Sequence, residues 1–316
     1  MVQFILPAIL SFILISSLSP FLIFILKKWN LIQPIRDELP EDQQEKRGTP
    51  LMLGLVFFIG TFISVLFSPT LIMIYLVSIF VLFGSIGFAD DWWKASKQNP
   101  AGISGKTKLI LQFGLTITFL LIALLGMELP ESINITDSIE LNMPLYIYLS
   151  VISLYIVGTT NAINFTDGMD GLLGMVAIPS YFFFFFISDS SEVQLFSIVM
   201  GVSLVGFLIY NIYPAKAFMG DTGSMAIGGS LAFLAVIEKV EVLIPLLFFV
   251  YLAEQLSVIV QVFIFKKTGK RLFRMTPIHY HFSLKYGWTE NVIVVLFTVV
   301  SWICMGLSLL YFTLMM

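Results

Sequence analysis

Charged residues, cysteine and histidine are scarce in this sequence. Of its 316 residues, 12% are charged and 58% are apolar, a composition that excludes an ordinary soluble globule and indicates a membrane protein. The single cysteine, Cys304, excludes a disulfide within the chain and a cysteine-ligated metal site. Two histidines are too few for a dedicated zinc site, which usually needs about four ligands.

Common enzyme motifs are also missing. The chain has no GxxxxGK[ST] loop, no GxGxxG turn and no serine nucleophile elbow, so nothing indicates ATP hydrolysis, dinucleotide binding or serine-hydrolase chemistry. A net charge of −3 gives no reason to expect a nucleic-acid partner. No linker, low-complexity tract or repeat divides residues 1–316, and we expect a single polytopic membrane domain.

The sequence consists largely of long apolar runs. A membrane span takes about 20 mostly apolar residues. Charged side chains are absent from 1–26, 51–89, 109–127, 141–166, 171–188, 193–215, 222–237, 242–253, 255–265 and 291–316. The run 51–89 is long enough for two spans broken at Ser68-Pro69-Thr70, so we expect ten transmembrane helices in an all-α fold. The first run lacks a basic flank and a cleavage site, and we expect it to be retained.

Basic residues predict how these helices are oriented. If the first span starts outside the cell, the cytoplasmic segments are 27–50, 89–108, 164–171, 211–224 and 266–290. These five segments hold 16 of the 17 lysines and arginines, so both termini are expected to be extracytoplasmic and the active site to lie on the five cytoplasmic loops. The segment 128–144 alternates polar and β-branched residues and predicts a short hairpin on the outer side.

The first group of reactive side chains is in "DDWWKASKQNPAGISGKTK", residues 90–108. Helical spacing puts Asp90 and Lys94 on one face, with Asp91 about 100° away. This pattern fits either a solvated helix end with an ion pair or two carboxylates and an ammonium that face a shared site. Lys106 and Lys108 can add positive charge for phosphates.

The second group is in "NAINFTDGMDGLLG", residues 161–174. Its polar side chains recur at every third position: Asn161, Asn164, Asp167 and Asp170. On one straight helix they would rotate through about 180°, so we expect the chain to turn at Gly168 and Gly171. The alternative is a polar loop between two helices, with Asp170 as an N-cap.

The third group, "NIYPAKAFMGDTGSMAIGG" at residues 211–229, leads directly into an apolar run. Two interpretations are open: Asp221 or Thr222 is simply the N-cap of that helix, or the glycines let backbone N–H groups approach a bound anion. Lys216 and Phe218 add a cation and a stacking surface.

The fourth group, residues 266–290, holds both histidines, His279 and His281. For Lys266 and Lys267 we prefer simple contact with anionic lipid headgroups. Elsewhere, "KRGTP" at 46–50 predicts a basic loop that can reach a phosphate, and Glu254 interrupts a span at mid-depth. An acid at that depth is either a functional group or a partner in helix packing.

Aspartates on three cytoplasmic segments, with lysines between them, are typical of a Mg²⁺-dependent phosphoryl-type transfer. Because the site lies at a membrane face, one substrate is expected to be a lipid phosphate. A transporter is the alternative of a different class. Transporters keep ionisable residues near the bilayer midplane, often in two related halves, whereas these acids gather at one face without a repeat.

Several of these stretches together carry a family resemblance. "GFADDWWK", "NAINFTDGMDGL", "FMGDTGSMAIGG" and "RMTPIHYHFSLKYGW" resemble the polyprenyl-phosphate sugar-1-phosphate transferase superfamily. The last stretch, with "KRGTP" and "EQLSVIVQVFIFK", resembles the phospho-N-acetylmuramoyl-pentapeptide-transferase branch of that superfamily. The motifs run in the expected order from residue 46 to residue 290.

The resemblance implies a multi-pass enzyme of the bacterial plasma membrane, surrounded by membrane lipids and able to form a homodimer. Its reaction would use Mg²⁺, UDP-N-acetylmuramoyl-pentapeptide and undecaprenyl phosphate, and would yield lipid I and UMP in peptidoglycan synthesis. The nearest enzymatic alternative is a relative that transfers N-acetylglucosamine-1-phosphate to a polyprenyl phosphate.

The resemblance also implies roles for individual residues. Asp90 and Asp91 match the paired acids of the family, with Asp90 as a base on the lipid phosphate, and Asp221 matches a Mg²⁺ ligand or nucleophile. Asp167 and Asp170 match further catalytic positions, with Asp167 as a second metal ligand. The implied substrate-binding residues are Lys46, Lys94, Lys106, Asn161, Asn164, Asn211, Phe218, Gly220, His279 and His281.

The chain departs from the family pattern in two places. The family usually has three consecutive histidines followed by an aromatic residue and a glutamate, whereas this chain has Tyr280 in the middle and Ser283 in place of the carboxylate. Leu51 and Leu53 replace a threonine and a glycine. Tyr280 cannot carry a positive charge near neutral pH, and the aspartates are unaffected.

Overall fold

The computed structural model describes residues 2–34, 44, 46–127, 130–136 and 138–316, and most of these residues are helical. The elements are α1 (Val2–Lys28), the 3₁₀ turn η1 (Leu53–Val56), α3 (Phe57–Phe67), α4 (Leu71–Lys97), α5 (Gly105–Met127), β1 (Ser132–Thr136), β2 (Ile139–Asn142), α6 (Leu145–Thr166), α7 (Leu172–Ile187), α8 (Ser191–Asn211), α9 (Gly220–Ile237), η2 (Glu241–Leu243), α10 (Ile244–Leu247), α11 (Phe249–Thr268), α12 (Ile278–Tyr286) and α13 (Glu290–Met315).

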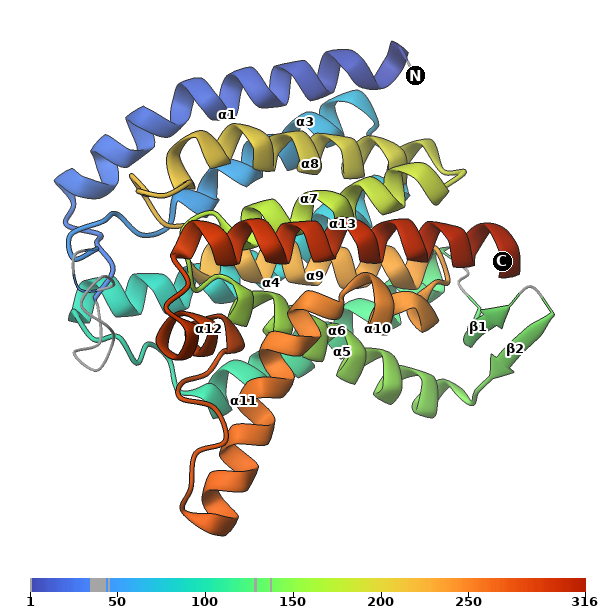
Figure 1. Cartoon of the computed structure of the whole chain (residues 1–316). Coiled ribbons are helices and arrows are strands. Elements are labelled where there is room, and N and C mark those ends of the chain that lie inside the picture. Colours follow the sequence, from blue (N-terminus) through green and yellow to red (C-terminus); the bar gives the residue numbers. More distant parts are fainter. Residues whose placement is uncertain (1, 35–43, 45, 128–129, 137) are drawn as a thin grey trace.

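Eight of the described helices are long and apolar enough to cross a membrane: α1, α4, α5, α6, α8, α9, α11 and α13. The shorter apolar helices Leu53–Phe67 and Leu172–Ile187 correspond to the other two expected runs. The all-α membrane fold is therefore confirmed, while the count of ten spans and the outward placement of the termini stay predictions. Figure 1 shows both termini at the same end of the bundle as β1 and β2.

The local sequence signals that begin and end these elements are seen in the structure. The break at Ser68-Pro69-Thr70 separates α3 from α4, and the Thr70 side chain accepts a hydrogen bond from the Met73 N–H. The expected hairpin is confirmed by β1 and β2, which pair antiparallel with Ile133 opposite Leu141. Residues 128, 129 and 137 of that segment lie outside the described residues.

Helix α9 lies at the centre of the bundle, and 16 of its 18 residues are buried. Its glycines, alanines and serines allow neighbouring backbones to come close, as in many membrane helix pairs. Gly228 lies against Thr160 of α6, and Gly229 lies against Phe83 of α4. A side chain at either glycine would overlap with its neighbour, so the small residues of α9 set its spacing from both helices.

Candidate active site

Asp91 of α4 joins that helix to the amino end of α9. One carboxylate oxygen accepts a hydrogen bond from the Asp221 N–H (3.0 Å), and the other accepts from the Thr222 N–H (2.8 Å) and hydroxyl (2.6 Å). These bonds satisfy N–H groups that a helix start leaves without partners. The prediction that Asp221 or Thr222 caps α9 is wrong, because the cap comes from another helix.

The contact between α4 and α9 depends on two glycines. Gly87 of α4 lies against the backbone of Asp221, and a Cβ at position 87 would overlap with it. Gly220 has a φ of +74° and lies against the Asp91 carboxylate. A larger residue at either position would push Asp91 away from the end of α9.

Three carboxylates and two ammonium groups gather at this contact. Asp90, Asp91 and Asp221 each present an oxygen within 4.8 Å of the others. Lys94 Nζ lies 2.6 Å from Asp90 and 3.1 Å from Asp221, and Lys108 Nζ lies 3.1 Å and 2.7 Å from the same two residues. The Asp90–Lys94 pair therefore belongs to a shared charged site rather than to a solvated helix end.

The three carboxylates differ in their access to solvent. The side chains of Asp90, Asp91 and Asp221 are 0%, 1% and 15% exposed. Asp90 also accepts a hydrogen bond from the Ile103 N–H (2.7 Å), so it anchors the loop after α4 together with both lysines. Asp221 presents the most accessible carboxylate of the group.

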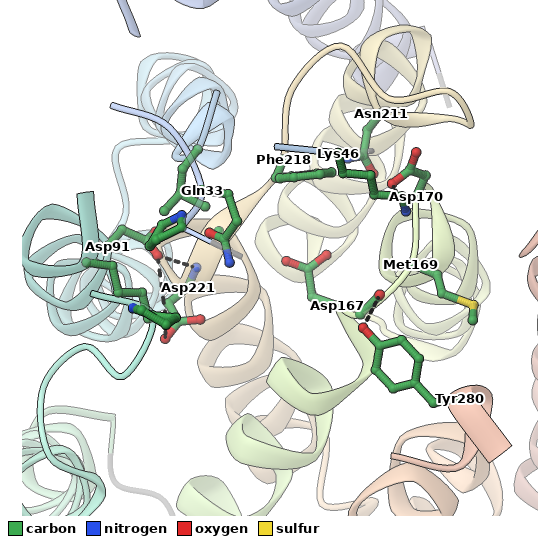
Figure 2. Close-up of a pocket in the computed structure, with 16 residues that line it drawn as sticks. Gln33, Lys46, Asp91, Asp167, Met169, Asp170, Asn211, Phe218, Asp221 and Tyr280 are labelled. Atoms are coloured by element: carbon green, nitrogen blue, oxygen red, sulfur yellow. Dashed lines mark hydrogen bonds and ion pairs between the residues drawn. The ribbon is translucent and has the colours of Figure 1, made fainter. Parts of the chain in front are cut away.

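A cavity of about 280 Å³ opens beside this group. Nine of the predicted catalytic and substrate-binding residues line it: Lys46, Asp91, Lys94, Asp167, Asp170, Asn211, Phe218, Gly220 and Asp221. Figure 2 shows Asp91 and Asp221 on one side of the cavity, Lys46 and Asp170 on the other, and Asp167 between them. Asp90 does not line the cavity, although the resemblance implies that it is a base.

The turn between α6 and α7 brings Asp167 and Asp170 to the cavity. The predicted bend is confirmed by the turn at 167–171, where Gly171 has a φ of +79°. The N-cap of α7 is Gly171 rather than Asp170. The Asp170 carboxylate instead accepts from Lys46 (2.6 Å) and from the Ala215 N–H (2.8 Å).

Glu290, the first residue of α13, supports Lys46 and Asp170 from behind the cavity lining. It accepts hydrogen bonds from Lys46 (2.7 Å) and from the Asp170 N–H. Glu290 is not among the residues predicted from the sequence, because an acid in the first turn of a helix is an ordinary feature. It lies two positions after Trp288, the last residue of the motif that carried the family resemblance, and this position was the available signal.

Asp167 is half-buried and lies between the two sides of the cavity (Figure 2). Burial, together with the negative charges of Asp221 and Asp91, raises the pKa of Asp167 to about 8. A cation bound between Asp167 and Asp221 would offset the repulsion between their negative charges.

Asn164 belongs to the site, whereas two other predicted residues do not. Asn164 Nδ2 donates to Asp221 (2.9 Å) and to Ser224 (2.8 Å), which ties α6 to α9. Asn161 donates to Gln112 on α5 (2.8 Å) and does not line the cavity. Lys106 is exposed, and the lysine that reaches the carboxylates is Lys108.

Neither histidine lines the cavity. His279 is hydrogen-bonded to Glu254, so the mid-span acid has a partner. His281 accepts a hydrogen bond from the Arg274 N–H (3.0 Å), and burial together with the charges of Lys285 and Arg274 lowers its pKa. Of the "HYH" group, Tyr280 is the residue that lines the cavity.

Comparison with known proteins identifies the family. The sequence profile of Glycosyl transferase family 4 matches residues 72–239. A phospho-N-acetylmuramoyl-pentapeptide-transferase of Staphylococcus carnosus is 39% identical to the chain over 311 residues, covering 93% of this chain and 94% of the relative. Proteins of the same name from Halalkalibacterium halodurans and Clostridium beijerinckii are 38% and 39% identical, over 94% and 93% of this chain and 93% and 92% of their own lengths. The chain belongs to the phospho-N-acetylmuramoyl-pentapeptide-transferase family.

Membership of the phospho-N-acetylmuramoyl-pentapeptide-transferase family confirms the resemblance seen in the sequence. With eight helices of span length among the described residues, the chain is a multi-pass bacterial membrane protein and a transferase. The match from α4 to the end of α9 includes the charged group at Asp90, Asp91 and Asp221. Family membership favours a transferase over a transporter.

The charged group of this phospho-N-acetylmuramoyl-pentapeptide-transferase family member can accept a divalent cation. Three carboxylates and two lysines leave one negative charge, and carboxylate oxygens suit a hard cation. Asp90 and Asp91 are almost fully buried, whereas Asp221 is partly exposed toward the cavity, so Asp221 is the best-placed ligand. Asp167 is not part of the three-carboxylate group, although the sequence predicts it as a second ligand.

Proposed function

We propose that this chain transfers phospho-N-acetylmuramoyl-pentapeptide from its UDP nucleotide to undecaprenyl phosphate, with lipid I and UMP as products. The reaction would be the first membrane step of peptidoglycan synthesis. The observation that carries the proposal is the meeting of Asp91, Asp221, Lys94 and Lys108 beside the cavity, in a chain about 39% identical to transferases of this name.

Lys94 and Lys108 supply positive charge where two anionic substrates meet. In the transfer, a bond forms between an oxygen of the lipid phosphate and the phosphorus that carries the sugar. The bond from that phosphorus to the UMP oxygen breaks, and UMP leaves with the electron pair. Fixed cations beside the reacting phosphates stabilise the negative charge that builds up on their oxygens. Asp90 and Asp221 hold both lysines in place, so the two ammonium groups need to move little when the substrates react.

Asp221 would hold Mg²⁺, with Asp167 on the facing turn as a second ligand. The bound ion would supply further positive charge to phosphate oxygens. The neighbours of Asp221 hold it in place for this task. Asp91 fixes its backbone, and Asn164 fixes its side chain.

We assign the uridine end of the donor to the side of the cavity that holds Lys46. Phe218 offers a ring for stacking, and Asn211 and Lys46 line the same wall. Asn211 is itself held by the Gly171 N–H (3.1 Å) and the Ala217 carbonyl (3.0 Å), so its place is set by the loops around it. We assign Asp90 to hold the two lysines, because it is buried and does not line the cavity.

The test is UMP release by purified protein with Mg²⁺ and undecaprenyl phosphate. UDP-N-acetylmuramoyl-pentapeptide and UDP-N-acetylglucosamine are compared as donors in parallel. We expect UMP and lipid I from the muramoyl donor and no product from the other. Release from UDP-N-acetylglucosamine alone would assign the chain to the other branch of the superfamily, and release from neither would reject the transferase proposal.

A further inference from the structure

Glu254 and His279 form a buried pair behind the turn that carries Asp167. Glu254 Oε1 lies 2.9 Å from His279 Nδ1, and Glu254 Oε2 accepts from the His279 N–H at 3.4 Å. Both side chains are 0% exposed. A carboxylate within an apolar span is costly to bury unless it has a partner, and here both oxygens face the first turn of α12. The transfer described above assigns no role to this pair.

The pair determines which way the histidine ring faces. Because a carboxylate accepts hydrogen bonds, we assign the hydrogen of the His279 ring to Nδ1, on the side of Glu254, with Nε2 turned to the opposite side. Nε2 is buried and has no hydrogen-bond partner within the described part of the chain. It lies against Gly168, where an added Cβ would overlap with the edge of the ring.

The next residue holds Gly168 by a hydrogen bond. The Tyr280 hydroxyl donates to the Gly168 carbonyl at 3.0 Å, and the ring centroids of His279 and Tyr280 lie 4.2 Å apart. Two consecutive residues of α12 therefore hold one glycine, by packing and by a hydrogen bond. Figure 2 shows the Tyr280 hydroxyl bonded to the turn next to Asp167.

We propose that Glu254 is a positioning residue for the transfer. It orients His279, and His279 with Tyr280 fixes Gly168, so that Asp167 stays directed into the cavity. Asp170 has separate anchors in Lys46 and the Ala215 N–H, so a loosened turn moves Asp167 more than Asp170. The inference rests on the proposed function, because its readout is the rate of that reaction.

The first experiment compares Glu254→Gln and Glu254→Ala with the wild type. Gln has nearly the shape of Glu but turns an amide NH₂ toward one of the two N–H groups, so the ring is held less firmly. We expect kcat to fall about tenfold in E254Q and about 100-fold in E254A. We expect KM for the UDP donor to change less than about threefold, because the Lys46 side of the cavity keeps its contacts.

The matched control is Glu241→Gln, a buried acid in η2 that lies outside the site. We expect this variant to keep the wild-type kcat. Binding of UMP, measured by calorimetry, and the unfolding temperature show whether each Glu254 variant remains folded. Wild-type kcat in folded E254Q and E254A would overturn the proposal, as would a change confined to KM.

A second experiment tests the contact between Gly168 and His279 directly. Gly168→Ala should lower kcat about 100-fold, because the new methyl group pushes against the ring, and His279→Ala should lower it about tenfold. In the double variant the methyl group occupies the vacated space, so kcat should be no lower than in His279→Ala alone. If the fold-losses in kcat of the two single variants multiply in the double variant, the contact between Gly168 and His279 is not the cause of the lower kcat.

Failure of this proposal can be told apart from failure of the proposed function. If the wild type releases UMP only from UDP-N-acetylglucosamine, the branch assignment fails, and the kcat ratios measured with that donor still test Glu254. If the wild type uses the muramoyl donor and the Glu254 variants match it, the function stands and the positioning role is rejected.

Discussion

Asp91 of α4 caps α9 from outside the helix, with its carboxylate 3.0 Å from the Asp221 N–H. The capping residue and the helix residue it caps both line the cavity, although they are 130 positions apart in sequence. Because Asp90 and Lys94 are on the same helix as Asp91, this one contact also brings them to Asp221. Activity should thus depend on how α4 and α9 meet.

Replacing Asp91 by Asn tests this dependence. Asn has the same shape but a single acceptor oxygen, so at least one donor at the start of α9 loses its partner. We expect kcat to fall about 100-fold and the free energy of unfolding to fall by about 1–3 kcal/mol. Thr222→Ser keeps the hydroxyl donor to Asp91 and should retain most of the wild-type rate. An Asp91→Asn protein with wild-type rate and stability would show that α9 needs no such cap.

Asp221→Asn should nearly abolish UMP release, with a loss of about 100-fold or more, because the most accessible carboxylate of the site loses its charge. Chelation of divalent metal should stop the wild-type reaction, and added Mg²⁺ should restore it. Ser224→Ala is the control, since it removes the hydrogen bonds with Asn164 and the Gly220 carbonyl but no charge, and we expect less than about a tenfold loss. Asp221→Asn with more than one tenth of the wild-type rate would contradict the assigned role.

Lys106 and Lys108 form a matched pair of variants on one helix. Lys108 contacts Asp90 and Asp221, whereas Lys106 is exposed. We expect Lys108→Gln to lower kcat by about 10–100-fold, because the charge beside the reacting phosphates is lost. Lys106→Gln should stay within about twofold of the wild type. A loss in Lys106→Gln as large as in Lys108→Gln would contradict the assignment of Lys108, and a larger loss would favour Lys106, as the resemblance implies.

Because of Glu241, at the end of the bundle that holds the hairpin, we expect the free energy of unfolding to depend on pH. Burial raises the pKa of Glu241 from 4.5 to about 7, and its two oxygens have no hydrogen-bond partner among the described residues. The folded state therefore binds this proton more tightly than the unfolded state does. The stability that this bound proton contributes is present below pH 4.5 and is lost as the pH rises through 7.

Glu241→Gln should remove that pH dependence. We expect the variant to be more stable than the wild type by about 1–3 kcal/mol at about pH 8 and equally stable near pH 4.5, as measured by thermal unfolding in detergent. Glu140→Gln, on the exposed strand β2, is the control and should leave the unfolding curve unchanged at both pH values. A variant that is less stable than the wild type at the higher pH would show that the charged carboxylate has a stabilising partner.

Local rules account for what could be predicted from the sequence. Apolar runs without charge became helices, since lipid leaves unpaired backbone groups no other partner. The break at Ser68-Pro69-Thr70, the hairpin around 132–142 and the pairing of Asp90 with Lys94 depend on residues only a few positions apart. The motifs that carried the family resemblance also contain most residues that line the cavity.

The sequence alone thus determined a membrane-embedded helical fold and the residue types of a phosphate-transfer site, because composition and short-range spacing express both. Only the tertiary structure decided that Asp91 caps α9, that Lys108 rather than Lys106 reaches the carboxylates, and that Glu290 joins Lys46. These contacts join segments more than 100 positions apart, and they depend on how closely glycines such as Gly87 let two helices approach. No local pattern encodes that approach, because it arises from packing across the whole bundle.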